Sequence, residues 1–472
     1  MELMIPLKPK GSKSMYEQIY EYMKEEIRRG SLAEGVRLPS TRVLAENLKV
    51  SRSTTQMAYD QLVAEGYVEA VPHKGYFVLR MEELAETEPE PAGAFMPERE
   101  EEQDESVIDF SPRGIDLTHF PYNAWRKVTR NTLVEDKKDM FLTGSPQGEP
   151  ALREAIRGYL HAARGVNCRA EQIIIGAGNE YLLMLLYQIL GPEQVIAMEN
   201  PTYKQAYRVF NSLGYEIVPV EMDSCGMDVT ALKNSQADIA YVMPSHQYPT
   251  GVVMPIVRRQ ELLQWAGSKE SRFLIEDDYD SEFRYKGKPI PALQGLDKTG
   301  KVIYMGTFSK SIAPAIRIGY LVLPQTLLGI YQEKLKFYAS TVSRIDQNII
   351  YQFLTEGYYE RHLNRMRAIY KGKHDLLLGQ LKNLEEDFEI HGENAGLHVL
   401  LTSKKRRTEK WLVEKAAHKG VKVYGLSSYF IHDHYSSQSA TVLLGYAKLS
   451  EEQIKKGGRL LCEAWQGQNE LS

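Results

Sequence analysis

The stretch Val302-Ile303-Tyr304-Met305-Gly306-Thr307-Phe308-Ser309-Lys310 joins an apolar run to a lysine that is flanked by hydroxyl side chains. The apolar residues 302–305 predict a short buried strand. Ligands of parallel α/β sheets bind at the carboxyl ends of the strands, and a lysine placed there can form an imine with an aldehyde. We therefore expect residues 306–310 to lie in a binding site.

Similar runs on both sides of this stretch predict the fold of residues 107–472. Short apolar runs of the β type alternate there with helical patterns, and this alternation is typical of α/β domains with a mostly parallel sheet. The predicted strands are 173–175, 195–198, 241–243, 273–275 and 302–305, with helices over 179–190 and 204–213.

Other strand ends carry polar or aromatic side chains that one cofactor can use. The turn 176–179 joins a strand to a helix, so its backbone N–H groups and the helix dipole form an anion site. A carboxylate at Asp277 can hold the N–H⁺ of a heteroaromatic ring, and Tyr203 can stack on that ring. Arg317 and Thr307 lie close enough in sequence to Lys310 to contact a phosphate. The set predicts pyridoxal phosphate (PLP) as the cofactor.

Each of these residues also has an ordinary structural explanation when it is taken alone. Lys310 can be a surface lysine, Asp277 and Asp278 can cap a helix, Tyr203 can belong to the core, and the glycines at 176 and 178 can form a plain turn. Their joint placement at predicted strand ends favours the cofactor site.

Residues 1–80 predict a winged helix-turn-helix. An amphipathic helix over 16–27 stops at Gly30, and a second helix over 41–48 is capped by Ser40. A third helix opens at Ser51 and ends at Gly66, with Met57, Ala58 and Leu62 on its core side. Two β runs, 67–71 and 76–79, then form a hairpin through the turn 72–75.

The third helix is suited to duplex DNA, because recognition helices read base edges with their N-terminal residues. Arg42 on the second helix can reach phosphate or guanine, and the hairpin tip can approach the backbone or the minor groove. The alternative is a protein-binding module with solvated charges. The predicted DNA-binding residues are Arg42, Ser51, Arg52, Ser53, Thr54, Lys74 and Gly75.

Charge is distributed unevenly along the chain of 472 residues. The 58 basic and 62 acidic side chains give a net charge of −4, which by itself argues against a nucleic-acid partner. Residues 1–80, however, carry a net charge of +2, residues 81–106 carry −10, and residues 107–472 carry +4. The acidic, proline-containing stretch 81–106 predicts a linker between two domains, 1–80 and 107–472, and the alternative is an acidic surface loop.

Composition excludes several other classes of protein. The apolar runs are too short for a membrane span, and the N-terminus lacks the pattern of a signal peptide. Cys168, Cys225 and Cys462 have no metal-ligand spacing, so we expect no metal site. A cytoplasmic location is the simplest expectation.

Residues 14–80 resemble the GntR-type winged-helix domain. The matching strings are Leu38-Pro39-Ser40-Thr41-Arg42-Val43-Leu44-Ala45, Val50-Ser51-Arg52-Ser53-Thr54, Ala64-Glu65-Gly66-Tyr67 and Gly75-Tyr76-Phe77-Val78. The resemblance implies that Arg42, Arg52 and the wing tip contact DNA.

Residues 107–472 resemble the fold-type I aminotransferases. The matching blocks are 148–156, 199–203, 249–251, 277–279 and Ser309-Lys310 with Arg317. The resemblance implies that Lys310 is the catalytic residue and forms a Schiff base with PLP, that Asp277 pairs with the pyridine nitrogen, that Tyr279 contacts the ring hydroxyl and that Tyr203 stacks on the ring. It implies that Thr307, Arg317 and the turn 177–179, which contains Gly178 and Asn179, hold the phosphate, and that Ser309 also binds the cofactor.

The two domains in this order resemble the MocR/GabR family of PLP-dependent transcriptional regulators. The resemblance implies a homodimer that binds a double-stranded DNA operator and senses PLP, or an amino acid or amine, through the aldimine at Lys310. Such a protein regulates transcription and is not primarily an enzyme, although partial transaminase reactions remain open to it. The alternatives are an active aminotransferase with an accessory DNA-binding domain and a PLP-storage or scaffold protein.

Two departures from the aminotransferase pattern concern the effector. Tyr248 stands where aminotransferases place an asparagine before Pro-Thr-Gly, and no arginine occurs between Arg407 and Arg459, where they place the arginine that binds the substrate carboxylate. A carboxylate therefore needs another partner, such as Arg113, Arg208 or a backbone site. The sequence 203–205 also lacks the additional arginine with which a regulator of this family senses γ-aminobutyrate.

Overall fold

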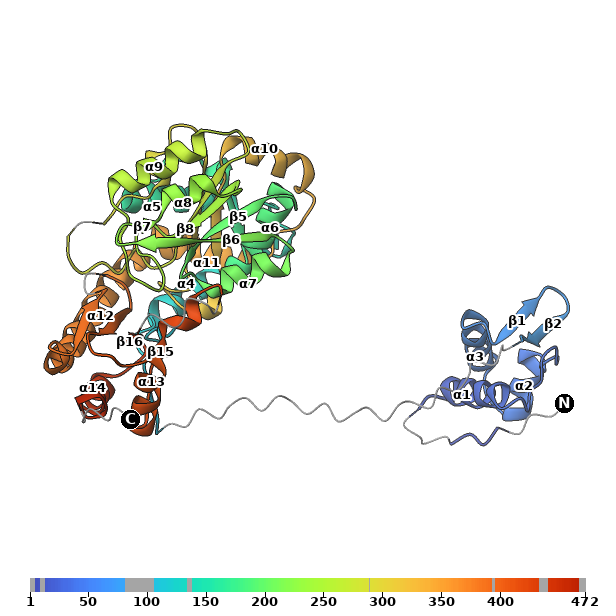
Figure 1. Ribbon diagram of the computed structural model, residues 1–472. Coiled ribbons are helices and arrows are strands. Elements are labelled where there is room, and N and C mark those ends of the chain that lie inside the picture. Colours follow the sequence, from blue (N-terminus) through green and yellow to red (C-terminus); the bar gives the residue numbers. More distant parts are fainter. Residues whose placement is uncertain are drawn as a thin grey trace. The chain divides into compact units, whose positions relative to one another are not determined.

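The computed structural model describes residues 5–8, 13–80, 106–133, 138–287, 289–392, 395–432 and 440–466. The chain divides into two compact units, Met1–Glu102 and Gln103–Ser472, each of which has its own core (Figure 1). The predicted linker 81–106 lies outside the described residues apart from Ser106.

The N-terminal unit is built, over residues 13–80, from three helices and a hairpin. The elements are α1 (Met15–Arg28), α2 (Thr41–Leu48), α3 (Arg52–Ala64), β1 (Val68–Val71) and β2 (Gly75–Val78). The two strands pair antiparallel. Ser40 and Ser51 cap α2 and α3, since their side chains accept from Val43 N and Thr54 N. The sequence predicted these elements and both caps.

One core residue of α3 was predicted wrongly. Met57 is 51% exposed, whereas Thr55, Ala58, Tyr59 and Leu62 are fully buried. These four share one helix face at spacings of three and four residues, and Met57 lies off that face. Thr55 is tolerated in the core because its hydroxyl donates to the Thr41 carbonyl at 2.8 Å.

An eight-stranded sheet organises the larger unit. The strand order along the sheet is β4 (Ile173–Gly176), β11 (Gly319–Val322), β10 (Val302–Thr307), β9 (Phe273–Asp278), β8 (Ile239–Val242), β5 (Val195–Asn200), β6 (Glu216–Asp223) and β7 (Gly226–Met227). The pairs β10–β9, β9–β8, β8–β5 and β5–β6 are parallel, and β11 is antiparallel to both β10 and β4. The carboxyl ends of β4, β5, β8, β9 and β10 therefore lie at one edge, and the sheet is mostly parallel, as predicted.

Both faces of this sheet are covered, which explains its continuous apolar strands. On one face, Met198 and Tyr241 pack with α6 (Asn179–Leu190), α7 (Lys204–Ser212) and α10 (Gln325–Lys334). On the other face, Ala197 and Ala240 pack with α8 (Val229–Asn234) and α9 (Ile256–Gly267). Figure 1 shows these helices around the sheet.

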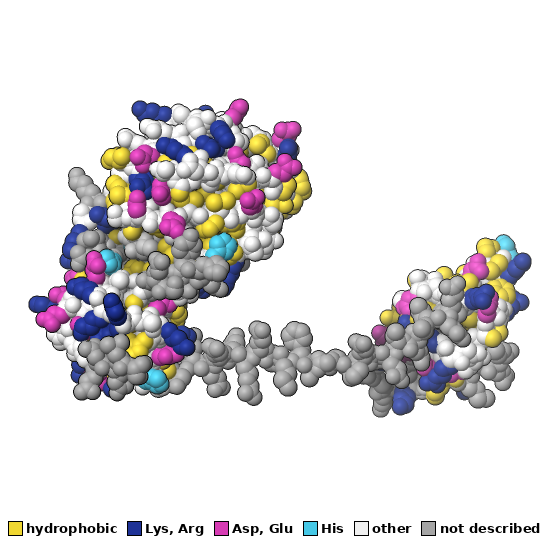
Figure 2. Space-filling model, viewed as in Figure 1, with side chains coloured by type: hydrophobic (Ala, Val, Ile, Leu, Met, Phe, Trp, Pro, Cys, Tyr) yellow, Lys and Arg dark blue, Asp and Glu magenta, His cyan; other side chains and the backbone are white. Residues whose placement is uncertain are grey.

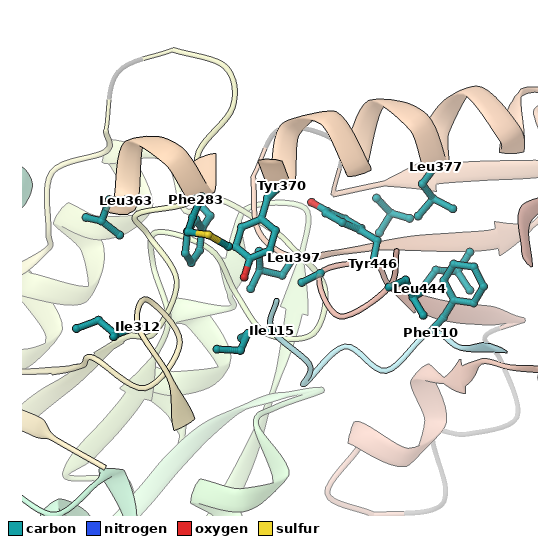
Figure 3. Close-up of a cluster of buried hydrophobic side chains, with 14 of the residues drawn as sticks. Phe110, Ile115, Phe283, Ile312, Leu363, Tyr370, Leu377, Leu397, Leu444 and Tyr446 are labelled. Carbon is teal, nitrogen blue, oxygen red and sulfur yellow. The ribbon is translucent and has the colours of Figure 1, made fainter. Parts of the chain in front are cut away.

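A second, smaller sheet lies toward the C-terminus. Its strand order is β12 (Phe388–His391), β13 (His398–Ser403), β16 (Thr441–Gly445) and β15 (Tyr424–Gly425), and β3 (Ile108–Asp109) pairs separately with β14 (Val421–Lys422). The other helices described in this unit are α4 (Tyr122–Thr132), α5 (Pro150–Arg164), α11 (Arg344–Thr355), α12 (Tyr358–Leu381), α13 (Glu409–His418) and α14 (Glu451–Gln466). Figure 3 shows Tyr370 and Leu377 of α12 in one core with Phe110, Ile115 and Leu444, so the segment that begins this unit is packed into it.

Candidate functional site

A pocket of about 300 Å³ opens at the carboxyl edge of the large sheet. Every cofactor residue that the sequence predicted lines it: Gly178, Asn179, Tyr203, Asp277, Tyr279, Thr307, Ser309, Lys310 and Arg317. The other lining residues are Arg113, Glu180, Gln205, Met243, Tyr248 and Pro314. The topology brings them together because β4, β5, β9 and β10 all end at this edge.

Lys310 follows the end of β10, and its amine is held by the backbone. Nζ donates to the carbonyl of Arg113 at 2.8 Å. The pKa of Lys310 is lowered to about 8, mainly by burial; the Asp280 carboxylate acts to raise it and the Arg113 guanidinium acts to lower it. A depressed pKa leaves more of the amine neutral near pH 7, which is the nucleophilic form.

Asp277 offers an acceptor that nothing in the described structure uses. It lies within β9, where Oδ2 accepts from the Tyr241 hydroxyl while Oδ1 is buried without a hydrogen-bond partner. Burial raises the pKa of Asp277 to about 7, opposed by the Tyr241 hydrogen bond. Because an unpaired buried acceptor is costly, Oδ1 fits a ligand that brings an N–H⁺, such as a protonated pyridine ring.

The Arg317 guanidinium lies beside the N-terminus of α6. Arg317 Nη2 contacts Glu180 Oε2 at 2.8 Å and the Ala177 carbonyl at 3.3 Å. Gly178 precedes α6 at φ +87°, and a Cβ there would lie 2.6 Å from the Arg317 guanidinium. Gly178 supplies no side-chain cap, and no described group bonds the buried Oδ1 of Asn179. A phosphate fits this arrangement of helix N-terminus and arginine.

Aromatic rings form another wall of the pocket. Tyr203 and Tyr248 meet edge to face with centroids 5.8 Å apart, and the Tyr248 hydroxyl lies 3.1 Å from that of Tyr429. Burial raises the pKa of Tyr203 to about 12. Both phenols therefore stay neutral in this environment and can contact a planar ring.

Two residues of the site were not singled out from the sequence. Nδ1 of His246 lies 3.0 Å from both Asp280 carboxylate oxygens and 2.9 Å from the Tyr279 hydroxyl, and the His246 and Tyr279 rings are stacked. Asp280 adjoins the predicted Tyr279, and this adjacency was the available signal. His246 lies 34 residues from Asp280 in the sequence, and no sequence pattern indicated that the two side chains meet.

Asp278 has a structural role. Arg164 Nε and the Tyr304 hydroxyl donate to its Oδ2 at 2.7 and 2.6 Å. Asp277 and Asp278 both lie within β9, so neither caps a helix, and the sequence placed the end of this strand too early. The Asp278 carboxylate is tolerated inside the buried strand because the Arg164 side chain is buried beside it.

The candidates for a carboxylate partner differ in position. Arg113 lines the pocket, whereas Arg208 is exposed on α7 and is not among the lining residues. The stretch 443–446 is buried, and Leu443, Leu444 and Tyr446 belong to the core.

The predicted DNA-binding residues lie on the surface of the N-terminal unit. Arg52 is the first residue of α3, and Ser51 Oγ lies 2.8 Å from Ser53 Oγ and 2.7 Å from Thr54 Oγ1. Arg42 is exposed and pairs with Glu46 at 3.1 Å.

The wing tip is a separate part of that surface. Lys74 and Gly75 lie at the hairpin turn, and no hydrogen bond within residues 13–80 joins Lys74 to the start of α3. Gly75 has φ +109°, and a Cβ there would lie 3.3 Å from Arg37 Nε. The Arg37 side chain therefore lies next to the wing tip. Figure 2 shows charges of both signs on the visible face of each unit.

Two negative findings apply to the described ranges. None of the helices described is long and apolar enough to cross a membrane. No group of three or more His, Cys, Asp or Glu side chains in those ranges is arranged to hold a metal ion.

Two family models match the chain. Residues 15–78 match the bacterial regulatory proteins of the gntR family, and residues 115–457 match aminotransferase class I and II. Among solved structures, a multiple substrate aminotransferase from Thermococcus profundus superposes with a TM-score of 0.68 at 26% identity, covering 77% of this chain and 92% of that one.

Relatives match over nearly the full length. The chain is 41% identical to the uncharacterized HTH-type transcriptional regulator YdeL of Bacillus subtilis, covering 96% of each chain. It is 32% identical to the probable rhizopine catabolism regulatory protein MocR of Rhizobium meliloti, covering 96% of this chain and 94% of that protein. It is also 32% identical to the pyridoxine biosynthesis transcriptional regulator PdxR of Corynebacterium glutamicum, with 91% and 92% covered. The chain therefore belongs to the MocR/GabR family of DNA-binding transcriptional regulators, in which a GntR-type winged helix is joined to an aminotransferase-like domain.

Proposed function

We propose that this regulator binds PLP at Lys310 and senses PLP, or an amino acid or amine, through that site. One observation carries the proposal: a lysine, an unpartnered buried aspartate oxygen and an arginine at a helix N-terminus share one pocket in a chain that also has a DNA-reading domain. Bound PLP supplies an aldehyde that reacts reversibly with amines.

Each residue of the pocket then has a role toward PLP. Lys310 is the attachment amine, Asp277 Oδ1 accepts from the ring nitrogen, Tyr279 faces the ring hydroxyl and Tyr203 stacks on the ring. The phosphate is held by Gly178, Asn179, Thr307, Ser309 and Arg317. The unpartnered Oδ1 supports the role of Asp277: a protonated ring nitrogen beside it would supply the counter-charge that offsets the burial raising its pKa to about 7.

Sensing requires two states of the protein that the ligand binds unequally. An amine that displaces Lys310 changes the contacts of that side chain, and coupling between sites of this kind is typically worth about 1–3 kcal/mol. In this scheme residues 1–80 read DNA, residues 81–106 link, and residues 107–472 bind the ligand in the cytoplasm.

A homodimer is part of the proposal. The larger unit exposes Phe141, Leu142 and Phe337 at 74, 62 and 77%, and large apolar side chains exposed to this degree are typical of a protein interface. Two copies place two reading heads on one operator, which raises the affinity for DNA without a large basic patch.

The second candidate is an aminotransferase with an accessory DNA-binding domain. It is favoured by the intact Lys310 and by the structural similarity to aminotransferases. Against it stand Tyr248 in place of the usual asparagine and the buried apolar stretch 443–446 in place of an arginine. Steady turnover of an amino donor with a keto acid would support this candidate.

The cofactor claim is tested by trapping. Borohydride reduction of the PLP-loaded protein, followed by peptide mapping, is expected to find the label on Lys310. Lys310→Ala should lose both the label and the visible absorption, while exposed Lys336→Ala keeps them. A label elsewhere, or a colourless wild type after addition of PLP, would refute PLP binding at Lys310.

The regulator claim is tested on DNA. Gel shifts with the region upstream of the protein's own gene should respond to PLP and to amino compounds in the wild type. Arg42→Ala combined with Arg52→Ala should abolish the shift and leave the PLP absorption intact. A shift that this double variant retains would mean that another face reads DNA.

A further inference from the structure

We infer that Arg113 binds the carboxylate of the effector, so that the effector is an amino acid rather than a simple amine. The inference rests on the proposed function, since it assumes that an amine reaches PLP at Lys310. Arg113 would take the carboxylate-binding role that aminotransferases give to a late arginine, because residues 408–458 of this chain contain no arginine.

The first argument is the distribution of charge in the pocket. Two arginines, Arg113 and Arg317, line it. Arg317 is paired with Glu180 at 2.8 Å and lies beside the turn before α6. Over the described ranges, Arg113 has no carboxylate within ion-pairing distance and no hydrogen bond from its guanidinium. An anionic ligand that enters the pocket can therefore pair with Arg113, whose charge has no carboxylate partner among the described residues.

The second argument is the distance from the reacting amine. The carbonyl of Arg113 accepts from Lys310 Nζ at 2.8 Å, so the arginine is adjacent to the lysine that an effector amine would displace. Its charge also reaches the aromatic wall, because it lowers the pKa of Tyr203, Tyr248 and Tyr429 against the raising effect of burial. The Arg113 guanidinium also acts to lower the pKa of Lys310, so an amine at Lys310 and a carboxylate at Arg113 would lie in the same pocket, as the two groups of one amino acid require.

The backbone on both sides of Arg113 is anchored to the rest of the larger unit. Gly445 N donates to the Phe110 carbonyl at 2.8 Å, and Lys373 pairs with the buried Asp116 at 2.7 Å. A Cβ at Gly114 would lie 2.6 Å from Cβ of Lys448, so the chain also passes closely there. A guanidinium on an anchored segment loses less freedom on binding, which favours affinity.

The alternatives on the chain are weaker. Arg208 is exposed on α7 and does not line the pocket. Gln205 lines the pocket but carries no charge, and a charge-assisted bidentate contact to a carboxylate needs an arginine.

The test compares matched ligands on the full-length, PLP-loaded protein. The probes are L-alanine and β-alanine, each against ethylamine, which has the same amine without the carboxylate, and γ-aminobutyrate against propylamine. Change in the visible absorption of PLP reports binding. The wild type should prefer at least one amino acid over its paired amine by roughly 10- to 100-fold.

The variants assign that preference. In Arg113→Ala the ratio should fall to about 1, whatever the change in the affinity for the simple amines, and Arg113→Lys should keep part of the wild-type ratio. Exposed Arg208→Ala should keep the wild-type ratio. Unchanged PLP absorption and melting temperature in Arg113→Ala exclude a folding defect.

The outcomes separate the two claims. A preference that survives Arg113→Ala, or a wild type that binds simple amines at least as well as all three amino acids, would overturn the role of Arg113 and leave PLP binding intact. A wild type that does not take up PLP would overturn the proposed function together with this inference.

Discussion

Tyr279 is held by a buried acid–imidazole pair. Because both Asp280 carboxylate oxygens face Nδ1 of His246, we infer that this nitrogen carries the proton; the Tyr279 oxygen lies 2.9 Å from the same nitrogen. Burial raises the pKa of Tyr279 well above its usual value, so the phenol keeps its own proton to donate elsewhere. Under the proposed function, the pair would position Tyr279 toward the ring hydroxyl of PLP, where aminotransferases use the asparagine that Tyr248 replaces in this chain.

This arrangement predicts a change in the titration of bound PLP. His246→Leu removes the N–H, whereas the amide N–H of His246→Asn can occupy the place of Nδ1. We expect the pH midpoint of the visible PLP absorption to shift by about one unit in His246→Leu, because this variant loses a hydrogen bond near the titrating group. His246→Asn should stay close to the wild type. Equal midpoints in all three proteins would show that His246 serves packing alone.

Glu199 is a second buried acid with an unused oxygen. Oε2 accepts from Met243 N at 3.3 Å, Oε1 has no partner among the described residues, and burial raises the pKa of Glu199 from 4.5 to about 8. Between these two values the folded state holds a proton that the unfolded state has lost. The stability contributed by this group is therefore greatest below about pH 4.5 and falls as the pH rises toward 8, by up to about 1.4 kcal/mol per pH unit.

Glu199→Gln should remove that part of the pH dependence. We expect thermal melts of the cofactor-free variant to lose less stability between pH 5 and pH 8 than the wild type does. Exposed Glu216→Gln is the control and should follow the wild type. Parallel wild-type and Glu199→Gln curves would mean that Glu199 is ionised in the folded protein.

At the residue scale the sequence predicted side chains that follow recognisable strand ends. Lys310 and Asp277 were found because each follows or closes an apolar run, and the structure brings both to one pocket. His246 was missed because its partners lie 33 and 34 residues away, and spacing of that kind carries no distance information. Met57 was placed in the core because it is apolar, whereas the hydrogen bond of Thr55 to Thr41 made a polar residue the better fit.

Among the elements, α6 connects local backbone geometry with ligand binding. Its preceding residue, Gly178, combines a positive φ with an approach to Arg317 that leaves no room for a side chain. Gly178→Ala should therefore strain the turn and displace Arg317, and so weaken PLP by roughly 10-fold or more, since a charge-assisted contact to phosphate is lost.

Pyridoxal, which lacks the phosphate, provides the comparison for Gly178→Ala. Titration of the visible absorption should show that this variant weakens PLP much more than pyridoxal. Gly191→Ala, at the other end of α6, has open space for a Cβ and φ +86°, and is the backbone-strain control. Equal losses for both ligands would argue against a phosphate at this turn.

Each helix and strand that the sequence predicted is present, and the ends of these elements were predicted less accurately. The caps at Ser40 and Ser51 fixed the starts of α2 and α3 because a hydroxyl that accepts from the third residue onward is a local signal. Strands β9 and β10 run to Asp278 and Thr307, two or three residues beyond their apolar runs. The polar end of β9 stays in the sheet because the buried side chains of Arg164 and Tyr241 donate hydrogen bonds to Asp278 and Asp277.

For the whole molecule, separate cores predict separate unfolding. The N-terminal core and the cores of the larger unit share no residue. Calorimetry on the full chain should resolve two transitions, and PLP should raise the one of the larger unit by several degrees and leave the other in place, because a ligand stabilises the state that binds it. Operator DNA should do the reverse. A single transition that moves as a whole with either ligand would contradict independent units.

The hydrogen bond from Lys310 Nζ to the Arg113 carbonyl joins the pocket to the segment that begins the larger unit. Segment 106–113, which leads from the DNA-reading head into the larger unit, is held at its far end by that amine. Under the proposed function, a ligand that occupies Lys310 would break this hydrogen bond, and one that also binds Arg113 would add a new contact to the same segment. The effect on transcription would then depend on the difference in ligand affinity between the two states of this segment, and not on the overall affinity. A ligand that binds both states tightly would leave transcription unchanged, and a weaker ligand that prefers one state would alter it.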